Sequence, residues 1–280
     1  MQIAYGTYAM PRTALEDAIP TLASLGYDGV EICISPQHVG SMPNELDAAR
    51  RRRLNDLLRQ HRMGVPAVFM LNQVLQDDSG HAANLEHTRR VAGLARDLGI
   101  GDTPVLATCI GGRSDDWESQ RKPIVDRLGD YDQLAREEGF RLACEPHTGA
   151  AVDRSERALW VFRTLNSPRV GLHFDIIHFY QAGETIEESV RRSVPITFHT
   201  HVTDGRRRSD GSFDLLLLGQ GELDTTAYVK AMHQAGWHSY ITAEVSVRIW
   251  GHEDYDPIEA ARISYTVLDR AFVEAGVPRT

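Results

Sequence analysis

Long apolar runs and paired cysteines are missing from this 280-residue sequence. No stretch approaches the ~18 apolar residues that a membrane span needs, and the segment Met1–Tyr5 begins like a strand and not like a signal peptide. The three cysteines are odd in number, lie far apart inside apolar runs and form no Cys-x-x-Cys pair; they are Cys33, Cys109 and Cys144. We therefore expect a cytoplasmic protein with no membrane partner, whose cysteines are reduced, small core residues.

An excess of basic charge is also missing. The chain has 30 Lys and Arg residues against 39 Asp and Glu residues, a formal net charge of −9. Affinity for nucleic acid depends largely on neutralising phosphates, so this balance argues against a nucleic-acid partner. Hydrophobic residues make up 42% and charged residues 25%, which is ordinary for a globular protein.

Strand-like apolar runs alternate with segments of helical periodicity along the whole chain. The eight runs are Ile3–Tyr8, Gly29–Ile34, Val65–Leu71, Pro104–Ile110, Phe140–Glu145, Val170–Ile176, Ile196–Val202 and Tyr240–Val245. Glycines that can end a helix in the left-handed conformation stand before several of these runs, at Gly26, Gly64, Gly99, Gly139 and Gly236. One strand in about 35 residues is close to the length of one βαβ unit.

Strands that alternate with helices pair in parallel, and their apolar sequence indicates burial on both faces. No Pro-, Gly- or Ser-rich linker divides the chain, so we predict one domain over residues 1–280, a single (β/α)₈ TIM barrel of the α/β class. A doubly wound open sheet is the alternative. The first strand is followed by Tyr8-Ala9-Met10-Pro11 without a glycine-rich phosphate loop, which disfavours it.

Polar side chains stand at the ends of four consecutive predicted strands, where a barrel has its active site. They are Glu145 and His147 after the fifth strand, Asp175 and His178 after the sixth, His199 and His201 in the seventh, and Glu244 in the eighth. A single carboxylate at such a position is often a helix N-cap. Four aligned strand ends are poorly explained in that way.

Charge then predicts a metal. Glu145, Asp175 and Glu244 would place three negative charges in one dry cavity, and no Lys or Arg lies in these strand ends. A divalent cation would reduce the three charges to one, with His201 as a neutral fourth ligand. Three oxygens and one nitrogen suit Mn²⁺ as the first choice, with Mg²⁺ or Co²⁺ as alternatives, and zinc ranks lower because it prefers more His or Cys ligands.

The histidines leave alternatives. His199 and His201 point the same way; the position nearer the strand end favours His201 as the ligand and leaves His199 one layer deeper. His173 shares the parity of Asp175 and is expected as a hydrogen-bonded histidine of the barrel interior. His147 and His178 either cap helices or contact substrate hydroxyls, and we assign them to substrate binding.

Four further features near the strand ends are weaker indications. Arg207, within Arg206–Arg208, lies where barrels often bind phosphate, although a solvated charge run is the competing interpretation. Trp250 either stacks on substrate or packs. Leu215–Leu218 either forms a lid or meets another chain, so a homo-oligomer or a partner subunit stays open. Glu31 either lines the site or supports it from behind.

At these residues the chain resembles the xylose isomerase-like TIM barrels, the sugar phosphate isomerase/epimerase group that includes ketose 3-epimerases. The resemblance covers nearly the whole chain, and its motifs are Glu145, Asp175-x-x-His178, His199-x-His201 with Asp204, Gly219-Gln220-Gly221-Glu222, and Glu244. It implies that Glu145, Asp175, His201 and Glu244 bind one divalent metal, that the two glutamates are the catalytic acid–base pair, and that His178 contacts substrate oxygens.

Two branches of this group need separate comparison. The endonuclease IV-type nucleases resemble the chain less, because the third and fourth strands here end in Val68-Phe69-Met70-Leu71 and Thr108-Cys109-Ile110-Gly111, without the further histidines those enzymes need. The stretch Val247-Arg248-Ile249-Trp250-Gly251 looks more like barrel subunits of C-glycoside-deglycosylating enzymes.

The resulting prediction is a metal-dependent sugar isomerase or epimerase. It would act on a ketose or ketose derivative by proton transfer through a metal-stabilised enediolate. The alternative is a metal-dependent lyase, a C-glycoside deglycosidase or keto-polyol dehydratase, because the same enolate can eliminate a β-substituent. A sugar-binding barrel without enzymatic activity is a third class.

Overall fold

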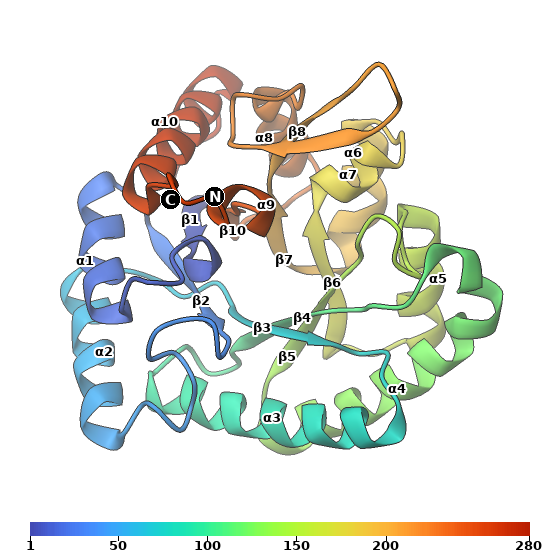
Figure 1. The fold of residues 1–280 in the computed structure, drawn as a ribbon, viewed down its shortest axis with the longest axis horizontal. Helices are drawn as coiled ribbons and strands as arrows, with labels where there is room; N and C mark the ends of the chain where they lie inside the picture. The colour runs from blue at the N-terminus through green and yellow to red at the C-terminus, as the bar shows by residue number, and fades with distance from the viewer.

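Eight parallel strands close into a barrel in the computed structural model, which describes residues 1–280. Around the barrel the strands follow the order β1-β10-β7-β6-β5-β4-β3-β2 (Figure 1). Their bounds are β1 Gln2–Gly6, β2 Gly29–Ile34, β3 Val68–Gln73, β4 Val105–Cys109, β5 Arg141–Glu145, β6 Val170–Asp175, β7 Thr197–Val202 and β10 Tyr240–Ala243. The predicted (β/α)₈ fold is confirmed, and each of the eight predicted runs overlaps one strand.

Helices surround the barrel, and the short helix α9 lies inside their outer ring, beside β10 (Figure 1). They are α1 Leu15–Leu25, α2 Ala48–Gln60, α3 Asp78–Asp97, α4 Trp117–Glu138, α5 Ser155–Leu165, α6 Ile176–Gln181, α7 Ile186–Ser193, α8 Thr225–Gln234, α9 Val247–Trp250 and α10 Pro257–Ala275. Helix α1 shows why they stay against the sheet: its buried residues Leu15, Ala18, Ile19 and Leu22 follow one face of a helix. None of the helices combines the length and the apolar character needed to cross a membrane.

Glycine ends helices where predicted, with one exception. Gly26, which follows α1, has φ of 104° and is left-handed, and Gly99, Gly139 and Gly236 also have positive φ. Gly64 was predicted to do the same for α2 and does not. The left-handed residue there is Arg62, with φ of 54°. Gly64 instead forms a β-bridge with Gly29, and a Cβ added at Gly64 would lie 1.9 Å from the Tyr240 hydroxyl.

A two-stranded antiparallel hairpin leaves the barrel directly after β7. It consists of β8 (Asp204–Arg207) and β9 (Phe213–Leu216) and projects from the barrel on the side of α6 and α8 (Figure 1). The buried Asp204 carboxylate anchors its base by accepting hydrogen bonds from the backbone N–H groups of Gly219, Gly221 and Leu223 at 2.9–3.1 Å. The aspartate and the Gly-Gln-Gly-Glu segment therefore form one loop-fixing unit.

Candidate active site

The four predicted ligand residues meet at the C-terminal end of the barrel. Glu145 and Asp175 are the last residues of β5 and β6, His201 lies in β7, and Glu244 directly follows β10. Nδ1 of His201 lies 3.5 Å from Oε1 of Glu145 and 3.3 Å from Oε2 of Glu244. Asp175 and Glu145 approach each other together with His178, with ligand atoms within 4.8 Å. Parallel pairing produces this convergence, since it aligns the carboxyl ends of the strands.

Several of these polar atoms are buried without a hydrogen-bond partner. Glu145 Oε1, Asp175 Oδ2 and His201 Nδ1 are all in this state. Their residues are at most 2% exposed. Buried polar atoms normally have partners, and a divalent cation among these carboxylate oxygens and the imidazole nitrogen would satisfy all three at once. The residues present therefore fit a metal ion.

Charge in the cluster is balanced by protons when no cation is bound. Burial and the nearby carboxylates of Glu244 and Glu145 raise the pKa of Asp175 well above its usual value. Burial opposes protonation of His201, but Glu31 and Glu244 outweigh it and raise the pKa of this imidazole. Burial also acts on Glu145, yet the histidines His147, His173 and His201 hold its pKa well below the usual value. A cation would replace these protons.

Glu31 fixes the orientation of the seventh-strand histidines. Its Oε2 lies 2.6 Å from Nε2 of His199 and 2.8 Å from Nε2 of His201, and its side chain is fully buried. A proton on Nε2 of His201 leaves the Nδ1 lone pair facing Glu145 and Glu244. The carboxylate behind the ring thus supports the imidazole, as carboxylates commonly do behind metal-bound histidines. His199 lies against Glu31 and does not join Glu145 and Glu244.

His173 differs from its prediction in one respect. It lies in the barrel interior, fully buried, as expected. It is not hydrogen-bonded, however, because neither ring nitrogen has a partner. The ring packs edge-on against His201 and Phe69, with centroids 4.1 and 5.7 Å apart, and burial with the neighbouring His201 lowers its pKa well below the usual value. The His173 ring is therefore neutral and packs among aromatic rings, so no charge is buried with its unpartnered nitrogens.

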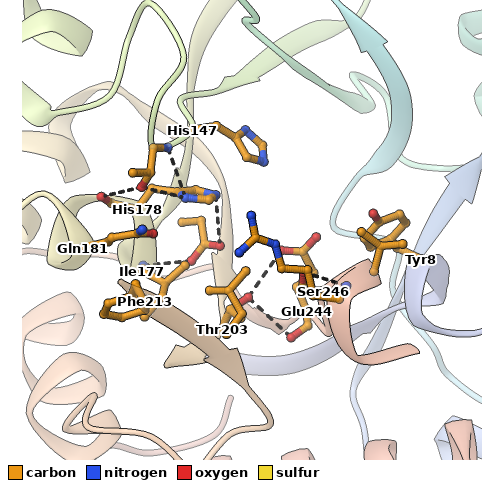
Figure 2. A pocket seen from close by; sticks show the side chains of 14 residues that line it. Tyr8, His147, Ile177, His178, Gln181, Thr203, Phe213, Glu244 and Ser246 are labelled. Carbon is orange, nitrogen blue, oxygen red and sulfur yellow. Dashed lines mark hydrogen bonds and ion pairs between the residues drawn. The ribbon is translucent and has the colours of Figure 1, made fainter. Parts of the chain in front are cut away.

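A cavity of about 260 Å³ opens above the cluster (Figure 2). Four predicted residues line it: Asp175, Glu244, His147 and His178. The rings of His147 and His178 are neighbours, with centroids 4.2 Å apart. Burial and the adjacent His147 lower the pKa of His178 to about 3, so this ring is neutral near pH 7. Its Nδ1 accepts from the backbone N–H of Thr148 at 3.4 Å, so the proton of the neutral ring lies on Nε2, which is the nitrogen left as a donor.

Trp250 and Arg207, both predicted to contact substrate, do not line this cavity. Trp250 packs edge-on against Tyr8, with ring centroids 5.4 Å apart, and Tyr8 is the residue that reaches the cavity. The guanidinium of Arg207 donates to the Gln181 carbonyl at 2.8 Å and lies over the Phe213 ring. The hairpin pairing directs Arg207 onto the protein surface, which sequence position alone does not reveal.

The leucine run contributes to the cavity wall through the same hairpin. Leu215 and Phe213 line the cavity, while Leu218 is buried at the hairpin base. This arrangement agrees with the lid interpretation of Leu215–Leu218 and gives these apolar residues contacts within the chain.

Cys109 was predicted as a core residue and instead borders the site. Cys33 and Cys144 are buried, but Cys109 is only partly buried and its Sγ lies 3.7 Å from Oε2 of Glu145. Burial and the nearby Glu145 raise the pKa of this thiol well above the usual value.

Other lining residues were missed by sequence reasoning. Thr203 hydrogen-bonds to Oε2 of Glu244 at 3.3 Å (Figure 2). Arg248 is the one Lys or Arg side chain among the lining residues, and Tyr8, Thr148, Gln181 and Ser246 complete the polar lining. Tyr8, Thr203, Ser246 and Arg248 all lie within a few residues of the end of a barrel strand. That position was the available signal.

Comparison with known proteins identifies the family. The family model of the xylose isomerase-like TIM barrel matches residues 19–270. The chain therefore belongs to the xylose isomerase-like TIM barrel family, as the strand-end motifs predicted.

The sequence is also similar to proteins named as isomerases, epimerases and dehydratases. An inosose isomerase of Bacillus subtilis (strain 168) is 25% identical over 183 residues, which is 64% of each chain and thus less than two thirds of that relative. A fructoselysine 3-epimerase of Escherichia coli O157:H7 is 22% identical over 247 residues, 84% of this chain and 86% of the relative. An inosose dehydratase of Clostridium perfringens (strain 13 / Type A) is 22% identical over 173 residues, 56% of this chain and 55% of the relative.

Solved structures share the fold. The crystal structure of the IolI protein with a bound zinc atom superposes with a TM-score of 0.82 at 20% identity, over 98% of this chain and 99% of that one. A D-psicose 3-epimerase structure determined in the presence of D-fructose gives a TM-score of 0.79 at 13% identity, over 99% and 100% of the two chains.

Proposed function

We propose that this chain is a divalent-metal-dependent isomerase or epimerase that moves a proton next to the carbonyl of a ketose or a cyclic keto-polyol. The observation that carries the proposal is the cluster of buried atoms without partners, on Glu145, Asp175 and His201, beneath a cavity of about 260 Å³. The relatives named for inosose isomerisation and fructoselysine 3-epimerisation support this substrate class.

The metal would be held by Glu145, Asp175, His201 and Glu244. When bound, a divalent cation supplies Lewis-acid stabilisation of negative charge on substrate oxygens, a contribution of several kcal/mol. Three carboxylates and one imidazole favour Mn²⁺, with Mg²⁺ or Co²⁺ next. The zinc atom in the IolI crystal structure shows that a divalent metal binds that related barrel.

Glu145 and Glu244 would be the acid–base pair. They come from β5 and the end of β10, which lie on different sides of the barrel with β6 and β7 between them, and His201 bridges the two through Nδ1. One carboxylate takes the proton α to the substrate carbonyl, and the other returns a proton to the opposite face, which inverts the centre. Thr203 holds the Glu244 carboxylate toward the cavity by donating its hydroxyl hydrogen.

The cavity wall would hold the sugar hydroxyls. His178 and His147 stand beside the cluster with adjacent rings, the His178 ring buried and neutral and the His147 side chain 41% exposed, and Thr148 and Gln181 also line the cavity. Thr148 already contacts Nδ1 of His178 through its backbone N–H and hydroxyl at 3.4 Å, which orients the ring (Figure 2). Tyr8, packed on Trp250, offers an aromatic surface across the cavity.

A lyase is the second candidate, and the inosose dehydratase relative favours it. After the same proton abstraction, the electron pair of the enolate would expel a β-hydroxyl or other β-substituent instead of accepting a proton. The leaving group would then need an acid, and whichever of Glu145 and Glu244 is protonated at that point would provide it.

Incubation with substrate candidates in D₂O tests the proposal and separates the two reactions. Ketoses, ketose phosphates, 3-keto-glycosides and inososes are followed by NMR with the metal-loaded protein. Deuterium at the carbon next to the carbonyl, with an isomeric product, supports the isomerase or epimerase. An enone or a released aglycone instead identifies the lyase, and absence of exchange in every substrate over hours would overturn both.

A further inference from the structure

Glu145 presents its two carboxylate oxygens to two different groups of side chains. Oε1 faces inward, 3.5 Å from Nδ1 of His201 and 3.9 Å from Nε2 of His173. Oε2 faces the other way, 3.6 Å from Nε2 of His147 and 3.7 Å from Sγ of Cys109. The proposed acid–base chemistry accounts for the first group, and the proposed function leaves Cys109 in the second group without a role.

The barrel itself brings Cys109 to this position. Cys109 is the last residue of β4, and the parallel register between β4 and β5 pairs it directly with Glu145, the last residue of β5. His147 follows two residues later in the same chain direction. The juxtaposition of thiol, carboxylate and imidazole therefore rests on strand pairing and not on the position of a mobile loop.

The spacing of the three atoms matches a metal site. Cysteine sulfur binds zinc at about 2.3 Å, and imidazole nitrogen and carboxylate oxygen at about 2.0–2.2 Å. At tetrahedral angles these bond lengths separate the ligand atoms by roughly 3.3–3.6 Å. The observed separations of 3.6 and 3.7 Å from the Glu145 oxygen are within a few tenths of an ångström of that range, and all three atoms lie within 4.8 Å of one another.

Access and ligand type select the kind of ion. The His147 side chain is 41% exposed and Cys109 is partly buried, so an ion can approach this side of the buried Glu145 carboxylate past His147, whereas His201 is fully buried. A thiolate is a soft ligand that favours zinc or cadmium over Mn²⁺ and Mg²⁺. The two sides of Glu145 thus differ in chemistry: oxygen ligands with one imidazole on one side, and sulfur with imidazole on the other.

We propose that Cys109, His147 and Oε2 of Glu145 form a second, thiolate-containing site for Zn²⁺ or Cd²⁺, with Glu145 bridging it to the site at His201. Binding forms the sulfur–metal bond as the Cys109 proton leaves to solvent, and water completes the coordination. An ion held there occupies the Glu145 carboxylate and withdraws it from proton transfer. The inhibition rests on the proposed function, whereas the binding does not.

Titration of the metal-free protein with Co²⁺ tests the site, because a cobalt–thiolate bond adds a near-ultraviolet charge-transfer absorption. The site at His201 contains no cysteine, so this absorption reports only the second ion. We expect this absorption to appear in the wild type as the second equivalent of Co²⁺ binds, and to disappear when Zn²⁺ is added. It should be absent in Cys109→Ser. The double variant Cys33→Ser/Cys144→Ser removes the two buried thiols and should keep it.

His147→Gln gives a second, independent test that leaves the thiol in place. This variant should lower the affinity for the second Co²⁺ ion at least about tenfold. The thiolate absorption should still appear at high Co²⁺ concentration. Circular dichroism spectra matching the wild type establish folding for each variant. Wild type that binds cobalt without the thiolate absorption, or Cys109→Ser that retains it, overturns the second site.

The functional consequence has its own readout. Zn²⁺ added to Mn²⁺-loaded protein should slow deuterium exchange in the wild type and not in Cys109→Ser. If neither protein exchanges deuterium, the proposed function fails while the cobalt spectra still decide the site. If zinc slows both equally, the bridging role of Glu145 is wrong.

Discussion

Oε2 of Glu31 lies 2.8 Å from Nε2 of His201, on the side of the ring away from Glu145 and Glu244. This carboxylate sets which imidazole nitrogen is free toward the cluster. Replacing Glu31 with Gln keeps the shape and removes the charge, so we expect metal affinity to fall about 10–100-fold. Competition with a chromogenic chelator measures it.

Glu188→Gln, on the outer helix α7, is a suitable control for the loss of one carboxylate. It should bind metal like the wild type, because Glu188 pairs with Arg192 on the surface. Unchanged affinity in Glu31→Gln would show that Glu31 does not orient His201.

Loss of either glutamate of the proposed acid–base pair should nearly abolish turnover. A general acid–base group accelerates a reaction about 10²–10⁴-fold, so Glu145→Gln and Glu244→Gln should each lower kcat about 10²–10⁴-fold or more. The amide oxygen still offers a ligand, so metal content measured by mass spectrometry of the native protein distinguishes lost chemistry from lost metal. Near-normal rates in both variants with metal bound would refute the assignment.

Strand-end positions in the sequence were enough to predict that Glu145, Asp175, His201 and Glu244 come together, because a parallel barrel brings the carboxyl ends of its strands together. The prediction that Cys109 is a core residue was wrong because it took no account of strand pairing. The register that pairs it with Glu145 is a property of two strands together, and an apolar run does not reveal it.

Arg207 shows a different limit of sequence reasoning. Its position after β7 suggested a phosphate contact, but the turn of the β8–β9 hairpin determines where the side chain points. The hairpin could not be predicted from Leu215–Leu218 alone, since four consecutive leucines have no strand alternation.

Raising the pH should strengthen metal binding. The pKa values of Asp175 and His201 are raised in the metal-free chain. A raised pKa contributes stability below the ordinary pKa, and this stability is lost as pH rises through the shifted value. The metal-free protein should therefore lose stability as the pH rises above the ordinary pKa values, about 4 for the Asp175 carboxyl and about 6.5 for the His201 imidazole.

A bound cation removes that penalty, so the increase in Tm on adding Mn²⁺ should grow as the pH rises above these ordinary pKa values. Binding should also release protons, which calorimetry detects as a heat that depends on the ionisation enthalpy of the buffer. A pH-independent Tm increase would contradict the proton–cation exchange.

Arg248 and Arg207 offer a matched comparison for substrate binding. Arg248 lines the cavity as its only Lys or Arg, whereas Arg207 donates to the Gln181 carbonyl outside the lining. If the substrate carries an anionic group, Arg248→Met should raise KM about tenfold or more with little change in kcat, since a charge-assisted hydrogen bond contributes about 1.5–3 kcal/mol. Arg207→Met should change KM less. The reverse order would restore the phosphate contact first predicted for Arg207.

Asp204 should matter for the hairpin more than for the chemistry. Its carboxylate accepts hydrogen bonds from the backbone N–H groups of Gly205, Gly219, Gly221 and Leu223, and an Asn amide cannot accept all of them. Each buried N–H left without an acceptor costs about 1–3 kcal/mol, so Asp204→Asn should lower Tm by several degrees and expose the hairpin to limited proteolysis.

Asp210→Asn, at the exposed hairpin turn, is the control, because the Asp210 carboxylate accepts hydrogen bonds only from Ser212. Equal Tm values for both variants would mean that Asp204 does not anchor the loop, since the two carboxylates differ in how many buried N–H groups they satisfy.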